Sequence, residues 1–515
     1  MSAIITEQFR ILSAENFHAG IASTGSSYYT WIGLPNAPEL DADWNTTPPA
    51  PVDSIGDENR YWDTMIAMKK INSSDVKKVV EKYTWASGEK YDMYRHDYSR
   101  NNLAPVSKAT SLYGAKYYVI NRDYRVYICL NNGFSPENTS GKPSLDEPLF
   151  TDLEPRAAGS SGDGYVWKYL YTLTPTDILR FDSTNFIPVP NDWQGDTTNA
   201  AVRDNALTSG QIKIVTISNR GTGYGTATTY SNVDILGDGE GAKASVTVNA
   251  NGKIQSVDIS NGGSGYSFGT VDLDGAGITN SASSTDAVTS VVIPPSGGHG
   301  SNIYQELGTR KVMLYTRLEN DSTNPDFVTG NEFARIGIVK DPEVFGSTTR
   351  LSAEKVSAVY ALKVTADQLS DITFDTDAVI TQTVGVGSTA IGRVVSWDSN
   401  TGVLKYWQDN RVATSTTAGT APLYGYKLLR FTNTLVNGGS FNIAGGNGTV
   451  AIDTSFSGIS TVLNNRTYFL GQTFDKGTAN PEVKPQSGDI IYVDNRPSVL
   501  RSSNQKEDIK IVLEF

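Results

Sequence analysis

The chain has 515 residues and a formal net charge of −12 at pH 7, and it is long enough for several domains with a substantial core. Hydrophobic residues make up 38% and charged residues 19%, whereas glycine (48) and tyrosine (26) are abundant, a composition that favours a β-rich, turn-rich protein. Nucleic-acid binding requires a patch of Lys and Arg, and the acidic sequence has no basic cluster, so we expect no nucleic-acid partner.

The single cysteine and the first residues indicate the compartment. Cys129 cannot form an intramolecular disulfide, and it lies in the apolar run 126–130, so we interpret it as a small buried hydrophobe rather than a nucleophile. This favours a protein made in a reducing cytoplasm. The first 20 residues lack the apolar region of a signal peptide, and no run is long enough to span a bilayer. We therefore expect no membrane partner.

The first 162 residues predict helices and strands in alternation. Apolar periodicity and turn residues indicate, in chain order, a helix over 7–19, a strand over 28–33, a proline-rich loop over 35–51, helices over 57–71 and 74–83, a hairpin over 117–130 and a long loop over 131–162. The spacing of Val76, Val79 and Val80 matches one face of a helix.

The stretch Gly162–Leu173 predicts a central strand. It begins with Gly-Asp-Gly, which forms tight turns because glycine adopts positive φ without a Cβ clash. Every odd position from 165 to 173 is apolar or aromatic, which is the period of a strand with one face strongly buried.

Residues 208–292 contain an internal repeat. The segment Val215–Tyr224, a strand followed by a glycine turn and a tyrosine, recurs 42 residues later as Val257–Tyr266. Asn251-Gly252 between the copies is a strong hairpin signal. Two copies predict a small β module of duplicated hairpins rather than a long solenoid.

In the rest of the chain, segments rich in apolar residues, as in a core, alternate with segments whose composition is typical of an insertion. Apolar runs near 311–315, 334–339 and 359–362 favour core strands, residues 392–407 favour a hairpin, and Ile509–Phe515 alternates as a strand on a half-solvated sheet. We predict a mainly β fold, a β-sandwich core with a few short helices that carries two inserted modules. The predicted parts are the N-terminal core 1–207, the first module 208–292, the core continuation 293–372, the second module 373–480 and the C-terminal core strands 481–515.

Two long motifs point to a family. Gly162–Leu173, followed by Asn185–Pro190, and Ser487–Pro497, followed by Ile509–Phe515, together resemble the gene-product-eight type of baseplate wedge protein of T-even-like contractile-tailed bacteriophages (myoviruses). The resemblance covers roughly residues 1–195, 300–365 and 485–515.

This resemblance implies a structural, late virion protein of the tail baseplate, assembled in the host cytoplasm during tail assembly. It further implies a homodimer that joins other wedge subunits, those resembling gene products seven, ten and six, and that changes geometry when the sheath contracts. Separately from the resemblance, the two insertions are expected to add contacts with neighbouring baseplate or tail-fibre proteins, and a glycan or ion site in the first insertion is the alternative. Arg496 before Pro497 is a motif residue, and its expected role is only to close the core.

A search for catalytic or metal-binding patterns favours none. The histidines, His18, His96 and His299, are far apart in sequence, and His-Glu-x-x-His and Cys-x-x-Cys are absent. His96 beside Asp97 suggests a hydrogen-bonded cluster more than a general base. The glycine-rich segments 221–225 and 237–241 lack the phosphate-loop ending, and Asp272 with Asp274 lacks the remaining calcium ligands. We therefore predict no catalytic, cofactor or metal site and no enzyme activity.

A second function stays open at the level of sequence. The Gly/Ser/Tyr-rich insertions and the aromatic residues Trp397, Tyr406 and Trp407 also suit a receptor-binding or glycan-degrading adhesion protein, since exposed rings stack on sugars. The same rings also suit the core of a small β module, and we favour that interpretation. A pair of carboxylates for glycoside hydrolysis is not singled out by the sequence.

Overall fold

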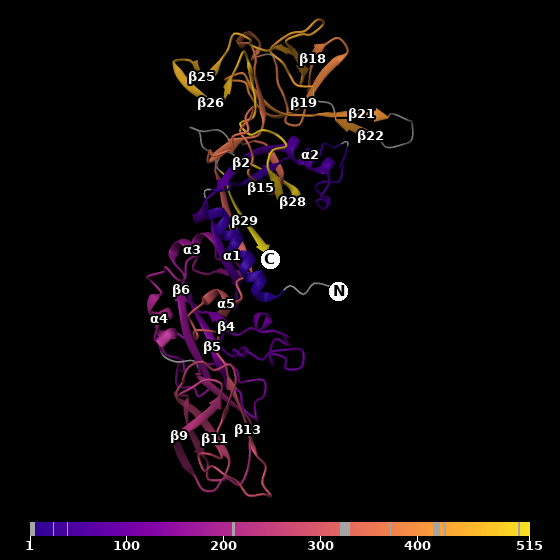
Figure 1. Cartoon of the computed structure of the whole chain (residues 1–515). Helices are drawn as coiled ribbons and strands as arrows, with labels where there is room; N and C mark the ends of the chain where they lie inside the picture. Colours follow the sequence, from indigo (N-terminus) through magenta and orange to yellow (C-terminus); the bar gives the residue numbers. More distant parts are fainter. Residues whose placement is uncertain are drawn as a thin grey trace. The chain divides into compact units, whose positions relative to one another are not determined.

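The computed structural model describes residues 6–23, 25–38, 40–208, 212–319, 330–370, 372–415, 423–426, 429–502 and 505–515. The fold is mainly β, with several sheets and a few short helices (Figure 1). The chain divides into two compact units: unit 1 is Met1–His18, Lys77–Met313 and Val512–Phe515, and unit 2 is Ala19–Val76 and Leu314–Ile511. Both are discontinuous, so the chain passes from one to the other after residues 18, 76, 313 and 511.

Unit 1 contains most of the helices. Its elements are α1 (Glu7–Ala22, which continues into unit 2), β3 (Val76–Glu81), η2 (Leu112–Gly114), β4 (Tyr118–Ile120), β5 (Arg125–Asn132), β6 (Tyr165–Thr172), α3 (Pro175–Arg180), β7 (Phe186–Pro188), α4 (Ala200–Thr208), β8 (Ile214–Arg220), β9 (Thr228–Gly237), β10 (Lys243–Val248), β11 (Ile254–Asn261), β12 (Gly269–Val271), β13 (Ala287–Val292) and α5 (Ile303–Leu307). Strands β14 (Lys311–Glu319) and β29 (Lys506–Glu514) run through the division between the units.

Strand β6 confirms the predicted strand and its glycine turn but is not central. The sheet order is β4-β5-β6, so β5 is the middle strand. On its other side β6 makes a single bridge, in which Trp167 and Arg156 exchange main-chain hydrogen bonds of 3.0 and 2.9 Å. In the turn, Gly162 and Gly164 have φ of +73° and +84°, and Asp163 Oδ1 accepts a hydrogen bond from Tyr165 N at 3.0 Å. Of the predicted buried face, Tyr165, Trp167, Tyr171 and Leu173 are buried and Tyr169 is half-buried. Lys168 and Leu170 on the other face are buried as well.

The two copies of the repeat make the same contacts. Strand β8 leads to the first copy's turn and β11 to the second copy's turn. Gly221 and Gly263 both have φ of +63°, and the hydroxyls of Tyr224 and Tyr266 accept hydrogen bonds from the main-chain N–H of Ala287 (2.7 Å) and Ala242 (3.2 Å). Each tyrosine thus fastens its glycine turn to a neighbouring strand.

Residues 214–292 form their own sheets, β11-β10-β9-β12 and β13-β8, around an apolar cluster drawn from residues 212–293. The hairpin predicted at Asn251-Gly252 is confirmed as the β10–β11 turn, where Gly252 has a φ of +65°. This segment belongs to unit 1, and its independent folding stays a prediction.

Unit 2 contains two larger sheets. Its elements are β1 (Tyr28–Gly33), α2 (Ile55–Thr64), β2 (Met65–Ile71), η1 (Ser73–Asp75), β15 (Glu332–Lys340), β16 (Lys355–Ser357), β17 (Tyr360–Lys363), η3 (Ala366–Gln368), β18 (Val379–Gly385), β19 (Ser388–Asp398), β20 (Val403–Gln408), β21 (Arg411–Ser415), β22 (Leu423–Tyr426), β23 (Asn442–Gly445), β24 (Gly448–Ala451), β25 (Gly458–Leu463), β26 (Arg466–Phe474), β27 (Thr478–Ala479) and β28 (Asp489–Leu500).

The five-stranded sheet has the order β16-β2-β1-β15-β28, and the seven-stranded sheet has the order β24-β23-β18-β19-β20-β17-β27. The predicted hairpin over 392–407 is confirmed as β19 and β20. Strand β17 pairs with β20, although the predicted boundary at residue 373 separates them. This sheet therefore begins before the predicted start of the second module.

Two predicted helices are corrected by the structure. The helix expected over 57–71 ends at Thr64, and Met65–Ile71 is strand β2, paired with β1. The helix expected over 74–83 is a short 3-10 turn followed by strand β3. The valines of β3 satisfy helical spacing, but β-branched side chains favour a strand, and β3 pairs with β7.

The C-terminal strand is confirmed as β29, in a sheet of order β29-β14-β3-β7. Ile509 and Ile511 are buried, whereas Lys510 and Glu514 are exposed, which is the alternation expected of a half-solvated strand. In unit 1 the ring of Phe515 lies 5.3 Å from that of Phe17.

Candidate functional site

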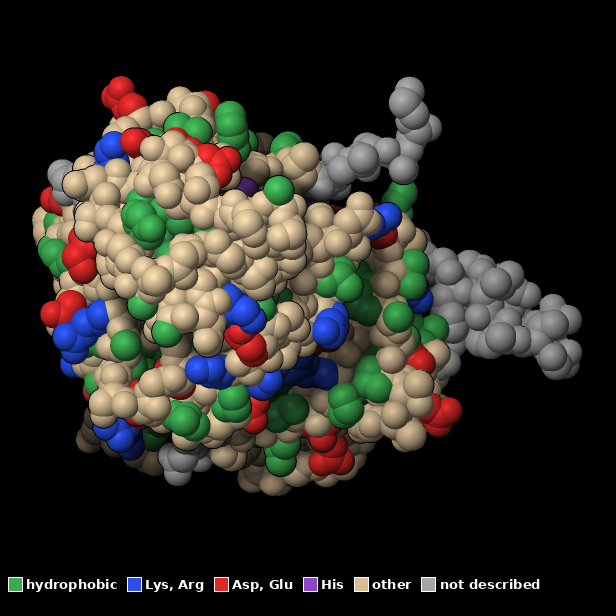
Figure 2. Space-filling model, turned by 90° about the horizontal axis from the view of Figure 1, so that it is seen from below, with side chains coloured by type: hydrophobic (Ala, Val, Ile, Leu, Met, Phe, Trp, Pro, Cys, Tyr) green, Lys and Arg blue, Asp and Glu red, His purple; other side chains and the backbone are tan. Residues whose placement is uncertain are grey.

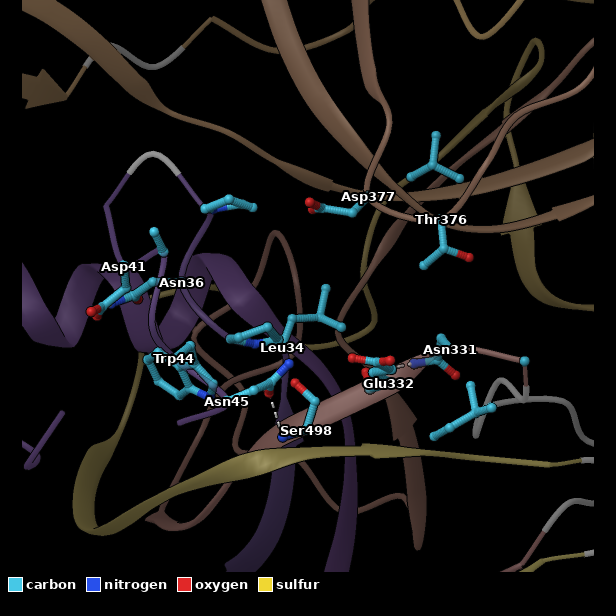
Figure 3. Close-up of a pocket in the computed structure, with 16 residues that line it drawn as sticks. Leu34, Asn36, Asp41, Trp44, Asn45, Asn331, Glu332, Thr376, Asp377 and Ser498 are labelled. Atoms are coloured by element: carbon cyan, nitrogen blue, oxygen red, sulfur yellow. Dashed lines mark hydrogen bonds between the residues drawn. The ribbon is translucent and has the colours of Figure 1, made fainter. Parts of the chain in front are cut away.

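A pocket in unit 2 is lined by segments far apart in the sequence (Figure 3). Its volume is about 490 Å³. Its walls come from the loop after β1, the start of β15, the end of β28 and the segment entering β18; the labelled lining residues are Leu34, Asn36, Asp41, Trp44, Asn45, Asn331, Glu332, Thr376, Asp377 and Ser498. Apolar side chains thus lie beside amides and carboxylates in one hollow.

Beside this pocket a buried guanidinium is hydrogen-bonded to the loop after β1, to α2 and to β28. Arg335, on β15, is only 1% exposed. It donates to Thr64 Oγ1 at 2.7 Å, to Asn495 Oδ1 at 3.2 Å and to Asn36 Oδ1. Among the described residues its hydrogen-bond acceptors are all neutral, so no carboxylate is bonded to it.

Aromatic rings compensate part of the charge of Arg335. The guanidinium carbon of Arg335 lies 4.8 Å from the ring of Trp44 and 5.2 Å from the ring of Tyr61, distances at which a cation is attracted by the ring face. Burial lowers the pKa of Arg335 to about 10, so the group stays charged at neutral pH. We call Arg335 with Asn36, Thr64, Asn495 and these two rings the Arg335 cluster.

The C-terminal motif is fastened to this cluster. Trp44 Nε1 donates to the carbonyl of Arg496 at 2.9 Å, Asn45 Oδ1 accepts from Ser498 N at 2.9 Å, and Asn495 Nδ2 donates to Pro49 O at 2.9 Å. The backbone of Arg496 therefore helps to close the core. Its side chain does not, since it is 47% exposed and pairs with Asp494.

The chemistry of the pocket suits recognition more than reaction. Its carboxylates, Asp41, Glu332 and Asp377, come from different elements, and Asp377 pairs with Arg393 at 3.4 Å. Among the described residues no group of three or more His, Cys, Asp or Glu side chains is arranged to hold a metal ion. The prediction that the protein is not an enzyme stays a prediction.

The predicted inert role of Cys129 agrees with its surroundings. The residue is fully buried on β5, and its Sγ contacts the carbonyl of Asn131 at 3.4 Å. Burial raises the pKa of the Cys129 thiol well above its ordinary value, so the thiolate that a nucleophile requires is disfavoured.

Each histidine has its own set of neighbours. His96 Nδ1 accepts from Ile293 N at 3.2 Å, while the adjacent Asp97 pairs with Arg95, so the imagined imidazole–carboxylate pair is not formed. His299 Nδ1 lies 2.6 Å from Glu306 Oε1, and both side chains are buried. His18 is half-buried, and this burial, with Lys78 and Lys77 nearby, lowers its pKa to about 4. The His299–Glu306 pair was not anticipated, although both residues are close in sequence.

The glycine-rich and acidic segments form turns. A Cβ on Gly239 would lie 2.4 Å from the ring of Tyr266, so the 237–241 loop needs glycine for packing. Asp238 accepts from Ser267 N at 2.9 Å, and hydrogen bonds from Ser267 lower the pKa of Asp238 to about 2. Asp272 Oδ1 accepts from Gly275 N at 2.8 Å, which is the pattern of a local turn.

The aromatic residues considered for sugar stacking lie mainly in the core. Tyr406 and Trp407 are buried, and Trp397 packs against Phe374 with ring centroids 5.2 Å apart.

Figure 2 shows one face of the molecule, on which neutral polar side chains and backbone predominate and charged groups of both signs are scattered. None of the helices in the described part of the chain is both long and apolar enough to cross a membrane.

Comparison with known proteins supplies one similarity. The chain resembles baseplate wedge protein gp8 of Enterobacteria phage T4. The two are 24% identical over 219 residues, which are 39% of this chain and 66% of the length of that protein. No family model matches the chain. The similarity supports a baseplate-related family, and the match leaves more than half of this chain without a counterpart.

Proposed function

We propose that this protein is a structural subunit of the baseplate wedge in a contractile phage tail. The observation that carries the proposal is the similarity to baseplate wedge protein gp8. The Arg335 cluster is consistent with it, because it ties the loop after β1, α2 and the C-terminal motif together by hydrogen bonds.

In this proposal the protein is a homodimer that joins other wedge subunits, those resembling gene products seven, ten and six. It holds the wedge in one geometry before attachment and allows a second geometry when the sheath contracts, as interfaces with two stable arrangements do in other switching assemblies. The segments 208–292 and 373–480 would add contacts with fibre proteins. The work is mechanical, and the protein is no enzyme.

The alternative, a receptor-binding or glycan-degrading protein, has less support. Its support in the sequence was the Gly/Ser/Tyr-rich insertions and exposed aromatic residues, and two of those aromatic residues, Tyr406 and Trp407, are buried. Incubation with host surface glycans tests it directly, and we expect no cleavage products. Cleavage that one Asp or Glu substitution abolished would overturn the proposed function.

The decisive experiment is an electron-microscopy map of intact tails that contain this protein. We expect density for the chain, in pairs, within the baseplate ring. Light scattering on the purified chain at micromolar concentration should give the mass of a dimer. Density at the tips of fibres, or absence from the baseplate, would refute the proposal.

A further inference from the structure

One edge of the five-stranded sheet is open over part of its length. Strand β28 is last in the order of this sheet, and no strand of the described chain pairs with its outer side. Near its C-terminal half the edge is covered, because Trp44 and Asn45 bond to the main chain of Arg496 and Ser498. Over residues 489–493 no such cover exists among the described residues.

The uncovered part of β28 forms one wall of a groove. Residues 489–493 lie on one side, and Pro51–Ser54 with Glu58 and Tyr61 of the α2 region lie on the other. The groove has a volume of about 430 Å³. Tyr61 Oη accepts from Val52 N at 3.1 Å and donates to Val52 O at 3.2 Å, so the opposite wall is held in place without a ligand.

The lining of this groove has a definite chemistry. Val52 is 55% exposed and Ile491 is 42% exposed, which places apolar side chains on both walls. Three carboxylates, Asp53, Glu58 and Asp489, line it as well, and no Lys or Arg does. The groove therefore combines unpaired main-chain groups, apolar contacts and a negative potential.

We propose that this groove, the β28 groove, binds an extended, basic segment of a neighbouring baseplate protein as an additional strand. The main chain of the segment pairs with the outer edge of β28, since an open sheet edge presents N–H and C=O groups ready for pairing. Alternating side chains of an added strand point to opposite faces. Lys or Arg at one set of positions meets the carboxylates, and apolar residues at the other set meet Ile491 and Val52.

Charge argues against a second copy of this chain as the occupant. A symmetric contact places the same surface on both partners. Each β28 groove would bring Asp53, Glu58 and Asp489 toward the same carboxylates, and like charges at an interface disfavour pairing. The homodimer contact is therefore expected on another surface. The identity of the occupant as a baseplate protein rests on the proposed function, whereas its chemistry follows from the groove.

The test uses the full chain and a fluorescein-labelled nonapeptide of alternating lysine and valine, followed by fluorescence anisotropy at low and at physiological salt. We expect saturable binding that weakens with salt, and no binding of a glutamate–valine peptide. A lysine–valine peptide N-methylated at every second amide should not bind, because it cannot complete the strand pairing. Equal binding of the lysine and glutamate peptides, or full binding after N-methylation, would overturn the proposal.

Two matched variants locate the binding site. The triple reversal Asp53→Lys, Glu58→Lys and Asp489→Lys should weaken binding of the lysine peptide at least about tenfold at low salt and should admit the glutamate peptide. A control reversal of three exposed carboxylates elsewhere, Glu89→Lys, Glu240→Lys and Glu354→Lys, should change the affinity far less. Equal losses in both variants would show non-specific attraction and refute the groove.

Light scattering tests whether β28 is instead a contact between two copies of this chain. If the groove reversal changes the mass measured by light scattering, β28 is a contact between copies and the proposal is wrong. Because peptide binding is measured on the isolated chain, its failure leaves the proposed baseplate role intact. Absence of the chain from baseplates would refute that role without affecting peptide binding.

Discussion

Replacement of Arg335 is the most demanding test of how unit 2 is held together. The Arg335→Ala variant leaves the acceptor oxygens of Asn36, Thr64 and Asn495 without their donor. An unsatisfied buried acceptor costs about 1–3 kcal/mol, but here two of the three acceptors are only half-buried. Relief of the desolvated charge offsets part of this loss. We expect the acceptors to contribute about 2–3 kcal/mol of net destabilisation.

Loss of the side chain's stem adds a second contribution. About 0.8 kcal/mol is lost for each buried methylene that alanine lacks, so Arg335→Ala should cost about 4–5 kcal/mol in total. Arg335→Met keeps the stem and should cost about half as much. Arg496→Met is the matched control: its side chain is exposed and pairs only with Asp494, so less than about 1 kcal/mol is expected.

The assay is thermal unfolding followed by tryptophan fluorescence, because Trp44 lies directly on Arg335. For a unit of this size each kcal/mol lowers the melting temperature by about 2–4 °C. Arg335→Ala should therefore lower the transition of unit 2 by about 10 °C or more, and Arg335→Met by roughly half of that. If the methionine variant melted like the parent, the hydrogen bonds of the Arg335 cluster would contribute no net stability and our account of the motif would be wrong.

Three further predictions concern other parts of the chain. Burial holds His18 neutral with a pKa of about 4, and its Nε2 has no partner among the described residues. In the unfolded chain His18 takes up a proton near pH 6.5, whereas in the folded chain it does not, so the stability of the fold decreases as the pH falls from about 6.5 to 4. The His18→Phe variant should show a smaller decrease in melting temperature over this pH range. Removal of the last seven residues exposes the edge of β14 and deletes the buried Ile509 and Ile511, at about 1.5–3 kcal/mol for each side chain; a truncated chain with unchanged melting would contradict the strand's structural role. Replacement of residues 208–292 by a short Gly/Ser linker should leave the melting of unit 2 and the dimer mass intact, because loop closure depends weakly on length; aggregation of that variant would show that the segment belongs to the core.

Local patterns predicted what depends on local contacts. The repeat ending at Tyr224 and Tyr266 was readable because each tyrosine fastens a glycine turn a few residues before it. The Gly162–Gly164 turn and strand β6 were readable for the same reason. The valines of β3 led to a wrong prediction, because their spacing fits one face of a helix whereas their β-branched side chains favour a strand. Tertiary pairing with β7 decides between the two.

The Arg335 cluster could not be predicted from the sequence. Arg335 lies in an apolar strand, and its acceptors are 160, 271 and 299 residues away along the chain. No periodicity connects positions so distant. The nearest signal was the Asp-Asn-Arg-Pro motif itself, whose Asn495 is one of the three acceptors. Its neighbour Arg496 attracted attention as a charged residue, but its carbonyl makes the contact that closes the core.

The four passages of the chain between units 1 and 2 have a mechanical consequence. Most two-domain proteins are connected by one covalent link, and a single proteolytic cut there releases two fragments. Here the backbone crosses after residues 18, 76, 313 and 511, so a cut at any one crossing leaves three others intact. Because both units are discontinuous, neither can be encoded as one uninterrupted gene segment. The two units therefore stay covalently connected after a cut at any one of the four crossings.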